Sequence, residues 1–189
     1  MPSKKVSHAD NQQERLIKIG WVIGFTDGEG CFSVGFVKQA DRIEKHRIRR
    51  GYKTGYQIFH EFAVTQGAKS LQSLRDLQQF FGIGKIYINT RYDNHKEHLY
   101  RYVVRRREDL LNVIIPFFRQ YQMRTAKNND FKKFARCVEL VKKGYHLKFS
   151  GINKIAKIVS TMNRQKTRNK LIKIPRDYTP NSKINLEKI

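Results

Sequence analysis

The sequence is poor in cysteine and has no long hydrophobic run. Its two cysteines, Cys31 and Cys137, lie far apart, which argues against a disulfide framework or a cysteine zinc site and suits a reducing compartment. No run approaches the roughly 18 apolar residues needed to cross a bilayer. The polar N-terminus also lacks the apolar stretch of a secretory signal. We therefore expect neither a membrane partner nor a secreted, disulfide-stabilised fold.

Acidic side chains are also scarce: 16 Asp and Glu face 39 Lys and Arg, which gives a formal net charge of +23. In a folded protein such an excess most often serves binding to nucleic acid, because each cation placed against a phosphate releases condensed counterions. Solubility alone is a weaker explanation, since positive charge is the less useful sign for it. With 39% hydrophobic residues and 12 Phe, the chain is not a disordered basic tail.

The length of 189 residues fits one domain of ordinary size. We expect a polar tail over residues 1–12, a single domain over 13–165 and a basic extension over 166–189. Hydrophobic periodicity predicts helices over residues 13–26, 70–81, 108–120, 127–142 and 152–164, and strands over 31–38, 56–66, 85–91 and 99–105. The basic stretch 39–55 shows no apolar pattern. This order predicts an α+β (mixed α/β) fold with one sheet, helices on one face and the other face free.

Three glycines in the first predicted helix, Gly20, Gly24 and Gly28, recur every four residues and so share one face. Each costs about 1 kcal/mol relative to alanine inside a helix, a cost that is tolerated where another backbone comes very close. Gly28 and Gly30 also suit a helix end followed by a turn. A dinucleotide-binding fingerprint is excluded, because these glycines follow a helix and precede a strand.

Two carboxylates, Asp27 and Glu29, lie where this helix ends. The helix dipole disfavours negative charge there by roughly 0.3–1 kcal/mol each. Two explanations stay open from the residues alone. The carboxylates could pair with nearby Lys or Arg, or they could hold a divalent cation, for which carboxylate and backbone oxygens are the preferred ligands of Mg²⁺.

Residues 22–30, VIGFTDGEG, resemble the signature of the LAGLIDADG homing endonucleases, with Val22 replacing Leu and Glu29 replacing the last Asp. The order of helices and strands, residues 64–66 (VTQ) and residues 115–118 (IPFF) followed by the basic stretch 124–127 are further matches. Together the matches cover about residues 13–165. The motif occurs once, so the chain resembles the single-motif, homodimeric branch of that family.

The resemblance implies an αββαββα fold whose antiparallel sheet forms a DNA-binding saddle. It also implies a sequence-specific endonuclease that cuts both strands of a long, nearly palindromic DNA site and promotes intron mobility. Glu29 and the carbonyl of Gly28 would hold the metal ion, with Asp27 as the second candidate. Mg²⁺ or Mn²⁺ would support cleavage, whereas Ca²⁺ can occupy the site without supporting it. Gln66 would orient water, and either Arg124 or Lys127 would complete the catalytic site.

Alternation along the strands predicts which side chains share the free face of the sheet. Ile58, Phe62, Val64, Ile86 and Ile88 are expected in the core. The outward side chains, predicted to bind DNA, are Ser33, Gly35, Val37, Gln57, Phe59, Glu61, Thr65, Lys85, Tyr87, Asn89, Arg91 and Arg101. Residues 42–53 and 105–107 are expected to grip phosphates, which gives affinity without sequence information. The predicted dimer interface is Gly20, Trp21, Ile23 and Gly24.

The main alternative is a non-catalytic nucleic-acid-binding protein on the same fold, either an intron RNA maturase or a DNA-binding regulator. Retention of Glu29 favours the nuclease, because a pure binder needs no carboxylate beside a phosphate. His95 and His98 are spaced like a metal pair but lie in a charged segment, so a solvated turn is the better interpretation. No small-molecule substrate is indicated. An organelle (chloroplast or mitochondrion) is suggested by the resemblance alone.

Overall fold

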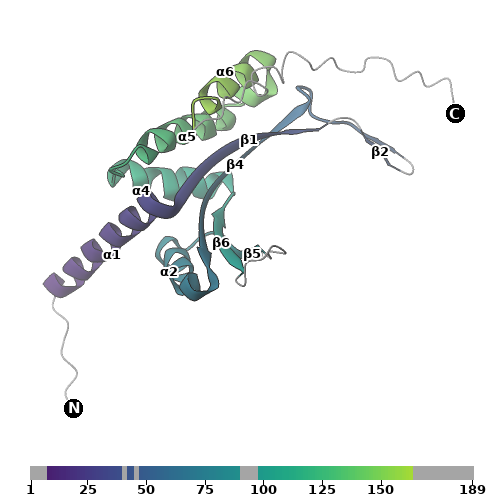
Figure 1. The fold of residues 1–189 in the computed structure, drawn as a ribbon. Helices are drawn as coiled ribbons and strands as arrows, with labels where there is room; N and C mark the ends of the chain where they lie inside the picture. The colour runs from purple at the N-terminus through teal and green to yellow at the C-terminus, as the bar shows by residue number, and fades with distance from the viewer. Residues whose placement is uncertain (1–7, 40–41, 45–46, 90–97, 164–189) are drawn as a thin grey trace, which may run out of the picture. The chain divides into compact units, whose positions relative to one another are not determined.

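The computed structural model describes residues 8–39, 42–44, 47–89 and 98–163. Figure 1 shows the order of the elements along the chain. The helices are α1 (His8–Glu29), α2 (Leu71–Phe81), α3 (Arg107–Asp109), α4 (Ile115–Gln120), α5 (Lys127–Lys142) and α6 (Phe149–Val159), and the strands are β1 (Gly30–Lys38), β2 (Arg42–Glu44), β3 (Arg47–Arg49), β4 (Tyr56–Gly67), β5 (Lys85–Asn89) and β6 (Leu99–Val104). Within these ranges, no helix has the length and apolar character needed to cross a membrane.

The main sheet has four strands in the order β1-β4-β6-β5. β6 pairs antiparallel with both β4 and β5, so residues of three strands align in rows across the sheet. The predicted succession of helix, two strands, helix and two strands is therefore confirmed. A second, two-stranded sheet was not predicted. It joins β2 to β3 with Ile43 opposite Ile48, inside the basic stretch that was expected to be a plain connection.

The chain forms two compact units. The first comprises residues 1–32 and 61–131, and the second comprises residues 33–60 and 132–189. β1, β4 and α5 each contribute residues to both units, so the boundaries cut through elements. The expected single domain over residues 13–165 thus stays a prediction.

Aromatic side chains build the core of the first unit. Phe32, at the start of β1, stacks on Phe62 of β4 with ring centroids 5.1 Å apart. Phe118 of α4 meets Phe32 edge-on at 5.7 Å, and Phe131 of α5 lies 5.2 Å from the same ring. All four rings are fully buried. Offset and edge-to-face contacts of this kind add about 0.5–1.5 kcal/mol per pair beyond burial, and they fix the ends of β1, β4 and α5 around the turn that follows α1.

The core of the second unit takes most of its buried side chains from two helices. Phe134 and Val138 of α5 are fully buried, as are Ile152 and Ile155 of α6. Lys133 Nζ donates to the carbonyl of Thr161, just beyond the end of α6. Burial raises the pKa of the Cys137 thiol to about 12, so this cysteine stays protonated as a core residue.

Several element boundaries differ from the predicted ones. α1 is longer at both ends than residues 13–26, and α6 begins and ends earlier than 152–164. The helix predicted over 108–120 is divided by a π-helical segment, Leu110–Ile114, directly before Pro116 at the start of α4. Proline has no N–H and its ring crowds the preceding turn, and a wider π turn accommodates it.

Candidate functional site

The chain turns sharply from α1 into β1 at Gly30. A Cβ atom at this position would lie 2.6 Å from both the Cγ2 atom and the carbonyl oxygen of Thr26. Because such an approach is impossible for any other residue without movement of the backbone, the turn requires glycine here. It places Asp27 and Glu29 together in the last turn of the helix.

Asp27 is fully engaged by the segment between α4 and α5. Its Oδ2 atom accepts hydrogen bonds from the backbone amides of Arg124, at 2.8 Å, and Thr125, at 3.0 Å. The Thr125 hydroxyl donates to Oδ1 at 2.5 Å. Partial burial raises the pKa of Asp27, but these hydrogen bonds and the charge of Lys127 outweigh it and hold the pKa below its usual value. Asp27 therefore anchors the α4–α5 connection to the end of α1.

Lys127, the first residue of α5, reaches the carbonyls at the end of α1. Its Nζ atom donates to the oxygens of Thr26, at 3.1 Å, and Gly28, at 2.9 Å. A cation is favoured at this end of a helix, which explains why α1 continues through two acidic residues. Desolvation lowers the pKa of Lys127, and the charges of Asp27, Cys31, Glu29 and Asp130 oppose this without cancelling it.

Glu29 differs from Asp27 in having no partner. Its side chain is exposed, and within the described part of the chain it forms no hydrogen bond or ion pair. The Lys127 ammonium acts on it electrostatically. No group of three or more His, Cys, Asp or Glu side chains in the described ranges could hold a metal by itself. A single carboxylate is therefore available at this turn for a cation or a substrate.

The structure separates the two basic candidates for the site. Lys127 lies against the turn through Gly28, whereas the Arg124 side chain is exposed and contributes its backbone amide to Asp27. Gln66 lies near the end of β4, half-buried and opposite Tyr100 of β6. Among the described residues, no hydrogen bond joins Gln66 to Glu29 or Lys127, so its predicted role with water stays a prediction.

One face of the sheet carries the row Thr65, Arg101 and Tyr87, from β4, β6 and β5 respectively. Lys85 and Asn89 lie two residues before and two residues after Tyr87 on β5, so alternation places them on the same face. The prediction that these five residues share a face is therefore confirmed. Phe62, Val64 and Tyr102, which alternate with them, are fully buried on the opposite face. Arg91 and His95 lie outside the described residues.

Glu61 was expected on the outer surface, and this expectation was wrong because the residue is 2% exposed. Glu61 accepts hydrogen bonds from Arg101 Nη2 and from Arg105 Nε, the latter at 2.8 Å. Two long arginine side chains thus cover the carboxylate. Glu61 is therefore buried between two arginines, and its carboxylate is not open to solvent.

Other face assignments also change. Ile88 was predicted to be a core residue, but it is 61% exposed because β5 is the edge strand and extends beyond the core. Gly35 was predicted to contact DNA, but a Cβ there would come within 2.7 Å of the Phe59 ring, so these two residues pack on each other. Val37 is exposed as predicted, and Ser33 is half-buried. Gln57 is exposed and accepts a hydrogen bond from Gln39.

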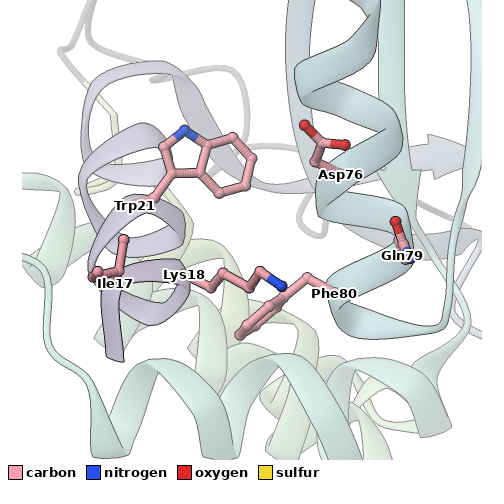
Figure 2. Close-up of a pocket in the computed structure, with 6 residues that line it drawn as sticks. All are labelled: Ile17, Lys18, Trp21, Asp76, Gln79 and Phe80. Carbon is pink, nitrogen blue, oxygen red and sulfur yellow. The ribbon is translucent and has the colours of Figure 1, made fainter. Parts of the chain in front are cut away.

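The outer face of α1 is apolar and open. Leu16 and Ile17 are 59% and 65% exposed, and Trp21 is 38% exposed while it stacks on Phe25. A Cβ at Gly20, Gly24 or Gly28 would meet nothing within 4 Å. Next to this stripe, side chains of α1 and α2 face each other across a groove of about 740 Å³, lined by Ile17, Lys18, Trp21, Asp76, Gln79 and Phe80 (Figure 2).

The family model for LAGLIDADG endonucleases matches residues 22–138, well over half of the chain. The chain belongs to the LAGLIDADG endonuclease family. The match begins at Val22 in α1 and ends in α5, so it includes Glu29, Lys127 and the whole β4-β6-β5 face.

Solved structures share the fold. The crystal structure of the homing endonuclease I-TnaI is 34% identical with a TM-score of 0.68, and the match covers 84% of this chain and 95% of that one. The I-SmaMI LAGLIDADG homing endonuclease bound to cleaved DNA is 29% identical with a TM-score of 0.69, and the match covers 86% of this chain and 49% of that one. These matches confirm the predicted mixed α/β LAGLIDADG fold.

The curated relatives are longer proteins. A probable intron-encoded endonuclease 2 from Neurospora crassa is 27% identical over 169 residues, which cover 86% of this chain and 32% of the relative. A probable intron-encoded endonuclease Cox1-I1b from Schizosaccharomyces pombe is 33% identical over 116 residues, which cover 61% of this chain and 26% of the relative. The chain thus spans between about a quarter and a third of the length of these two relatives.

Sequence reasoning missed the roles of Thr125 and Arg105 and could not choose between Lys127 and Arg124. One signal was present for Lys127. It is the first residue of α5, and a cation at the N-terminus of a helix is disfavoured by the helix dipole. The same argument had drawn attention to Asp27 and Glu29. No local pattern predicts the pairing of Glu61 with Arg105, because these residues are 44 positions apart.

Proposed function

We propose that this protein is a site-specific, metal-dependent DNA endonuclease that cuts both strands of a long, nearly palindromic site as a homodimer. One observation carries the proposal: Glu29 has no hydrogen-bond or ion-pair partner among the described residues, while Asp27 accepts from Thr125 and the Lys127 ammonium is held at the same turn by the Gly28 carbonyl. A fold that holds a single unpaired carboxylate at a rigid turn next to an ammonium group is suited to phosphoryl-transfer chemistry.

The residues at the turn fit a divalent metal that is shared with substrate. Asp27 has its oxygens occupied by Arg124 and Thr125 amides and the Thr125 hydroxyl, which leaves Glu29 as the ligand. The Gly28 carbonyl, the second predicted ligand, already accepts a hydrogen bond from Lys127 and has one further lone pair. Mg²⁺ usually keeps several waters and binds through one or two carboxylates plus substrate phosphates. The site therefore suits Mg²⁺ or Mn²⁺ as the ion that supports cleavage. Ca²⁺ is expected to bind there without supporting it.

When bound, such a metal activates a water molecule and neutralises charge that develops on the phosphate. The residues of this chain bind and position the reacting groups. Glu29 holds the cation, and Asp27 keeps the α4–α5 connection fixed so that Lys127 stays at the turn. The Lys127 ammonium lends positive charge beside the scissile phosphate, where a preorganised charge is most effective. Gln66 is assigned to water orientation by the family resemblance.

The charge of the molecule and the sheet support DNA as the substrate. The chain carries +23, and Lys85, Arg101 and Arg105 lie along the β5–β6 part of the sheet. Because phosphate contacts by Lys and Arg release counterions, such a surface gives strong, salt-dependent affinity. I-SmaMI, which this chain resembles, has been seen bound to cleaved DNA. An intron-encoded origin and an organelle as the compartment belong to the same proposal.

The homodimer is proposed from the surface of α1 and from the extent of the structural matches. Leu16, Ile17 and Trp21 expose an apolar stripe, and Gly20 and Gly24 leave space for a second helix backbone. The groove beside Trp21 extends this surface (Figure 2). The match covers 95% of I-TnaI but 49% of I-SmaMI, so one copy of this chain corresponds to half of the longer protein. Two copies would supply one Glu29 for each DNA strand.

The decisive experiment incubates the purified chain with a library of duplexes that span candidate insertion sites, in Mg²⁺, in Ca²⁺ and in EDTA. We expect double-strand cuts at one sequence in Mg²⁺, binding without cuts in Ca²⁺, and no cuts in EDTA. Sequence-specific binding without cuts in Mg²⁺ or Mn²⁺ would contradict the proposal and favour the non-catalytic alternative. Cleavage by a single copy, measured by sedimentation of the protein–DNA complex, would contradict the homodimer.

A further inference from the structure

A buried carboxylate on the sheet face is not needed for the proposed cleavage chemistry. The Glu61 side chain is 3% exposed, and both of its oxygens are bonded to guanidinium groups. Arg101 uses Nη2 and Arg105 uses Nε, the latter at 2.8 Å. Burying a charge costs several kcal/mol unless its partners are well placed. Two arginines around one carboxylate therefore form a cluster with defined geometry and a net charge of +1.

The way in which Arg105 is held leaves its other edge available. Its Nε–H faces Glu61, and its Cζ atom lies 6.0 Å from the centroid of the Tyr87 ring, within the range of a cation–π contact. The Arg105 side chain is nevertheless 56% exposed, and its Nη1 and Nη2 groups make no hydrogen bond within the described ranges. The guanidinium is thus fixed by its Nε edge and by one face, and it presents a pair of N–H groups to solvent.

The cluster lies where a DNA groove would meet the sheet. Arg101 and Tyr87 occupy one row with Thr65, on the face opposite the buried core. Beside them is a hollow of about 310 Å³, lined in part by Lys85, Tyr87, Arg105 and Arg106. Its lining also includes Asp109, so cations outnumber the single carboxylate there. The hollow can take the edge of a base pair.

We propose that Arg105 reads one guanine in the major groove through a bidentate contact from Nη1 and Nη2 to O6 and N7, and that Glu61 is its positioning residue. This inference rests on the proposed DNA-cleaving function. It replaces the expectation that residues 105–107 grip phosphates alike. Arg106 fits that expectation, because its side chain is 74% exposed and its nearest carboxylates are 3.9 and 4.0 Å away. A bidentate Arg–guanine pair gives base discrimination, whereas a phosphate contact gives none.

The test measures base preference rather than affinity alone. Binding sites are selected from a randomised duplex library in Ca²⁺ for the wild type and for R105K, E61Q and R106A. The Arg-to-Lys change keeps the charge but removes the bidentate fork. We expect R105K to lose discrimination for guanine at one position of each half-site by roughly 5- to 150-fold. Its affinity for random duplex should stay within about twofold of wild type.

E61Q should weaken the same preference while its affinity for random duplex is unchanged or higher, because a negative charge is lost. If Glu61 had a purely structural role, E61Q would instead lower the guanine preference and the affinity for random duplex together. Replacing that guanine by 7-deazaguanine, which lacks the N7 acceptor, should weaken wild-type binding and leave R105K unaffected. R106A, the matched control, should keep every base preference and lower the slope of log K against log salt by about one.

The inference is overturned if R105K keeps the wild-type base preferences. It is also overturned if 7-deazaguanine, placed at any guanine of the site, changes DNA binding by neither the wild type nor R105K. If E61Q does not fold, as judged by circular dichroism, the R105K and 7-deazaguanine results still decide the matter. A wild-type protein without any sequence preference would instead overturn the proposed function. The two failures are therefore distinguishable.

Discussion

Two clusters of charged side chains in the first compact unit, one at the end of α1 and one on the sheet, are built in opposite ways. On the sheet, one carboxylate, Glu61, is buried between two arginines. At the end of α1, Asp27 accepts three hydrogen bonds while Glu29, two residues later, is exposed and has no partner in the described ranges. Each cluster therefore contains a carboxylate with hydrogen-bond partners, and the cluster at the end of α1 also contains one without them, Glu29.

The difference separates two uses of an acidic residue in a strongly basic protein. An engaged carboxylate positions other groups: Asp27 positions the α4–α5 connection, and Glu61 positions Arg105. An unengaged carboxylate at a rigid turn is available to an external cation. Removing an engaged carboxylate should change the positions of neighbouring groups. Removing the unengaged one, Glu29, should lower the cleavage rate without changing the fold.

The largest effect is expected for E29Q. Loss of the ligand carboxylate should lower the cleavage rate by about 10³-fold, equivalent to roughly 4 kcal/mol of barrier, while DNA binding is retained. The thermal midpoint should not change, because the side chain has no partner. D27N is the matched variant and should lower the free energy of unfolding by about 1 kcal/mol. Cleavage by E29Q within tenfold of wild type would contradict the assignment of Glu29.

A change at the open face of α1 tests the dimer separately from the chemistry. G24L adds a side chain where the monomer has free space, so the monomer should fold and gain about 0.8 kcal/mol of helix propensity. Cleavage should fall by at least about 100-fold because the helices of two copies can no longer approach. G30A is the control, since its Cβ would clash with Thr26 and should destabilise the fold. Sedimentation and thermal unfolding distinguish the two variants.

The role of the cation facing Glu29 is tested by K127M, which removes it. We expect cleavage to fall by roughly 10- to 100-fold, because a charge aimed at the phosphate is lost. Binding to DNA should change by less than about fivefold. R124A is the control, since Arg124 contributes its backbone amide to Asp27 and its side chain is exposed. Equal losses in the two variants would contradict the choice of Lys127.

The smallest effect concerns acid stability. Hydrogen bonds hold the pKa of Asp27 below its usual value, so the folded state binds this proton less readily than the unfolded chain does. The stabilising contribution is therefore complete above the unfolded pKa of about 3.9 and is lost as the pH falls through the lower folded value. The difference in unfolding free energy between wild type and D27N should shrink below about pH 4. A difference that is constant from pH 3 to pH 7 would contradict this assignment.

The sequence predicted the elements with strong periodicity and missed those defined by long-range contacts. α5 has the predicted bounds, because its apolar spacing is regular over four turns. β2 and β3 were missed because Ile43 and Ile48 are isolated apolar residues in a basic stretch and show no alternation that would predict a strand. Alternation placed Tyr87 and Arg101 correctly, but it could not reveal that β5 is an edge strand, which leaves Ile88 exposed.

For the candidate site, the motif alone located Glu29, Asp27 and Gly28. The resemblance already ranked Glu29 above Asp27, but how Asp27 is engaged depends on the position of Thr125, which is 98 residues away. The choice of Lys127 over Arg124 likewise depends on where α5 begins. Local sequence thus predicts which groups are near the chemistry, whereas tertiary contacts decide which of them are occupied.

The exposed apolar stripe of α1 and the net charge of +23 have a joint consequence for the response to salt. If two copies pair through that stripe as proposed, their net charges would oppose the approach, and screening by salt would relieve the repulsion. Binding to DNA has the opposite dependence, because its affinity comes from counterion release. Pairing of copies in solution is thus favoured by salt, whereas loading onto a duplex is opposed by it. DNA, as a polyanion, would neutralise both copies without that loss. Copies that assemble on the target should therefore show activity that falls steadily as salt is raised, whereas copies that must pair first in solution should show an activity optimum at intermediate ionic strength.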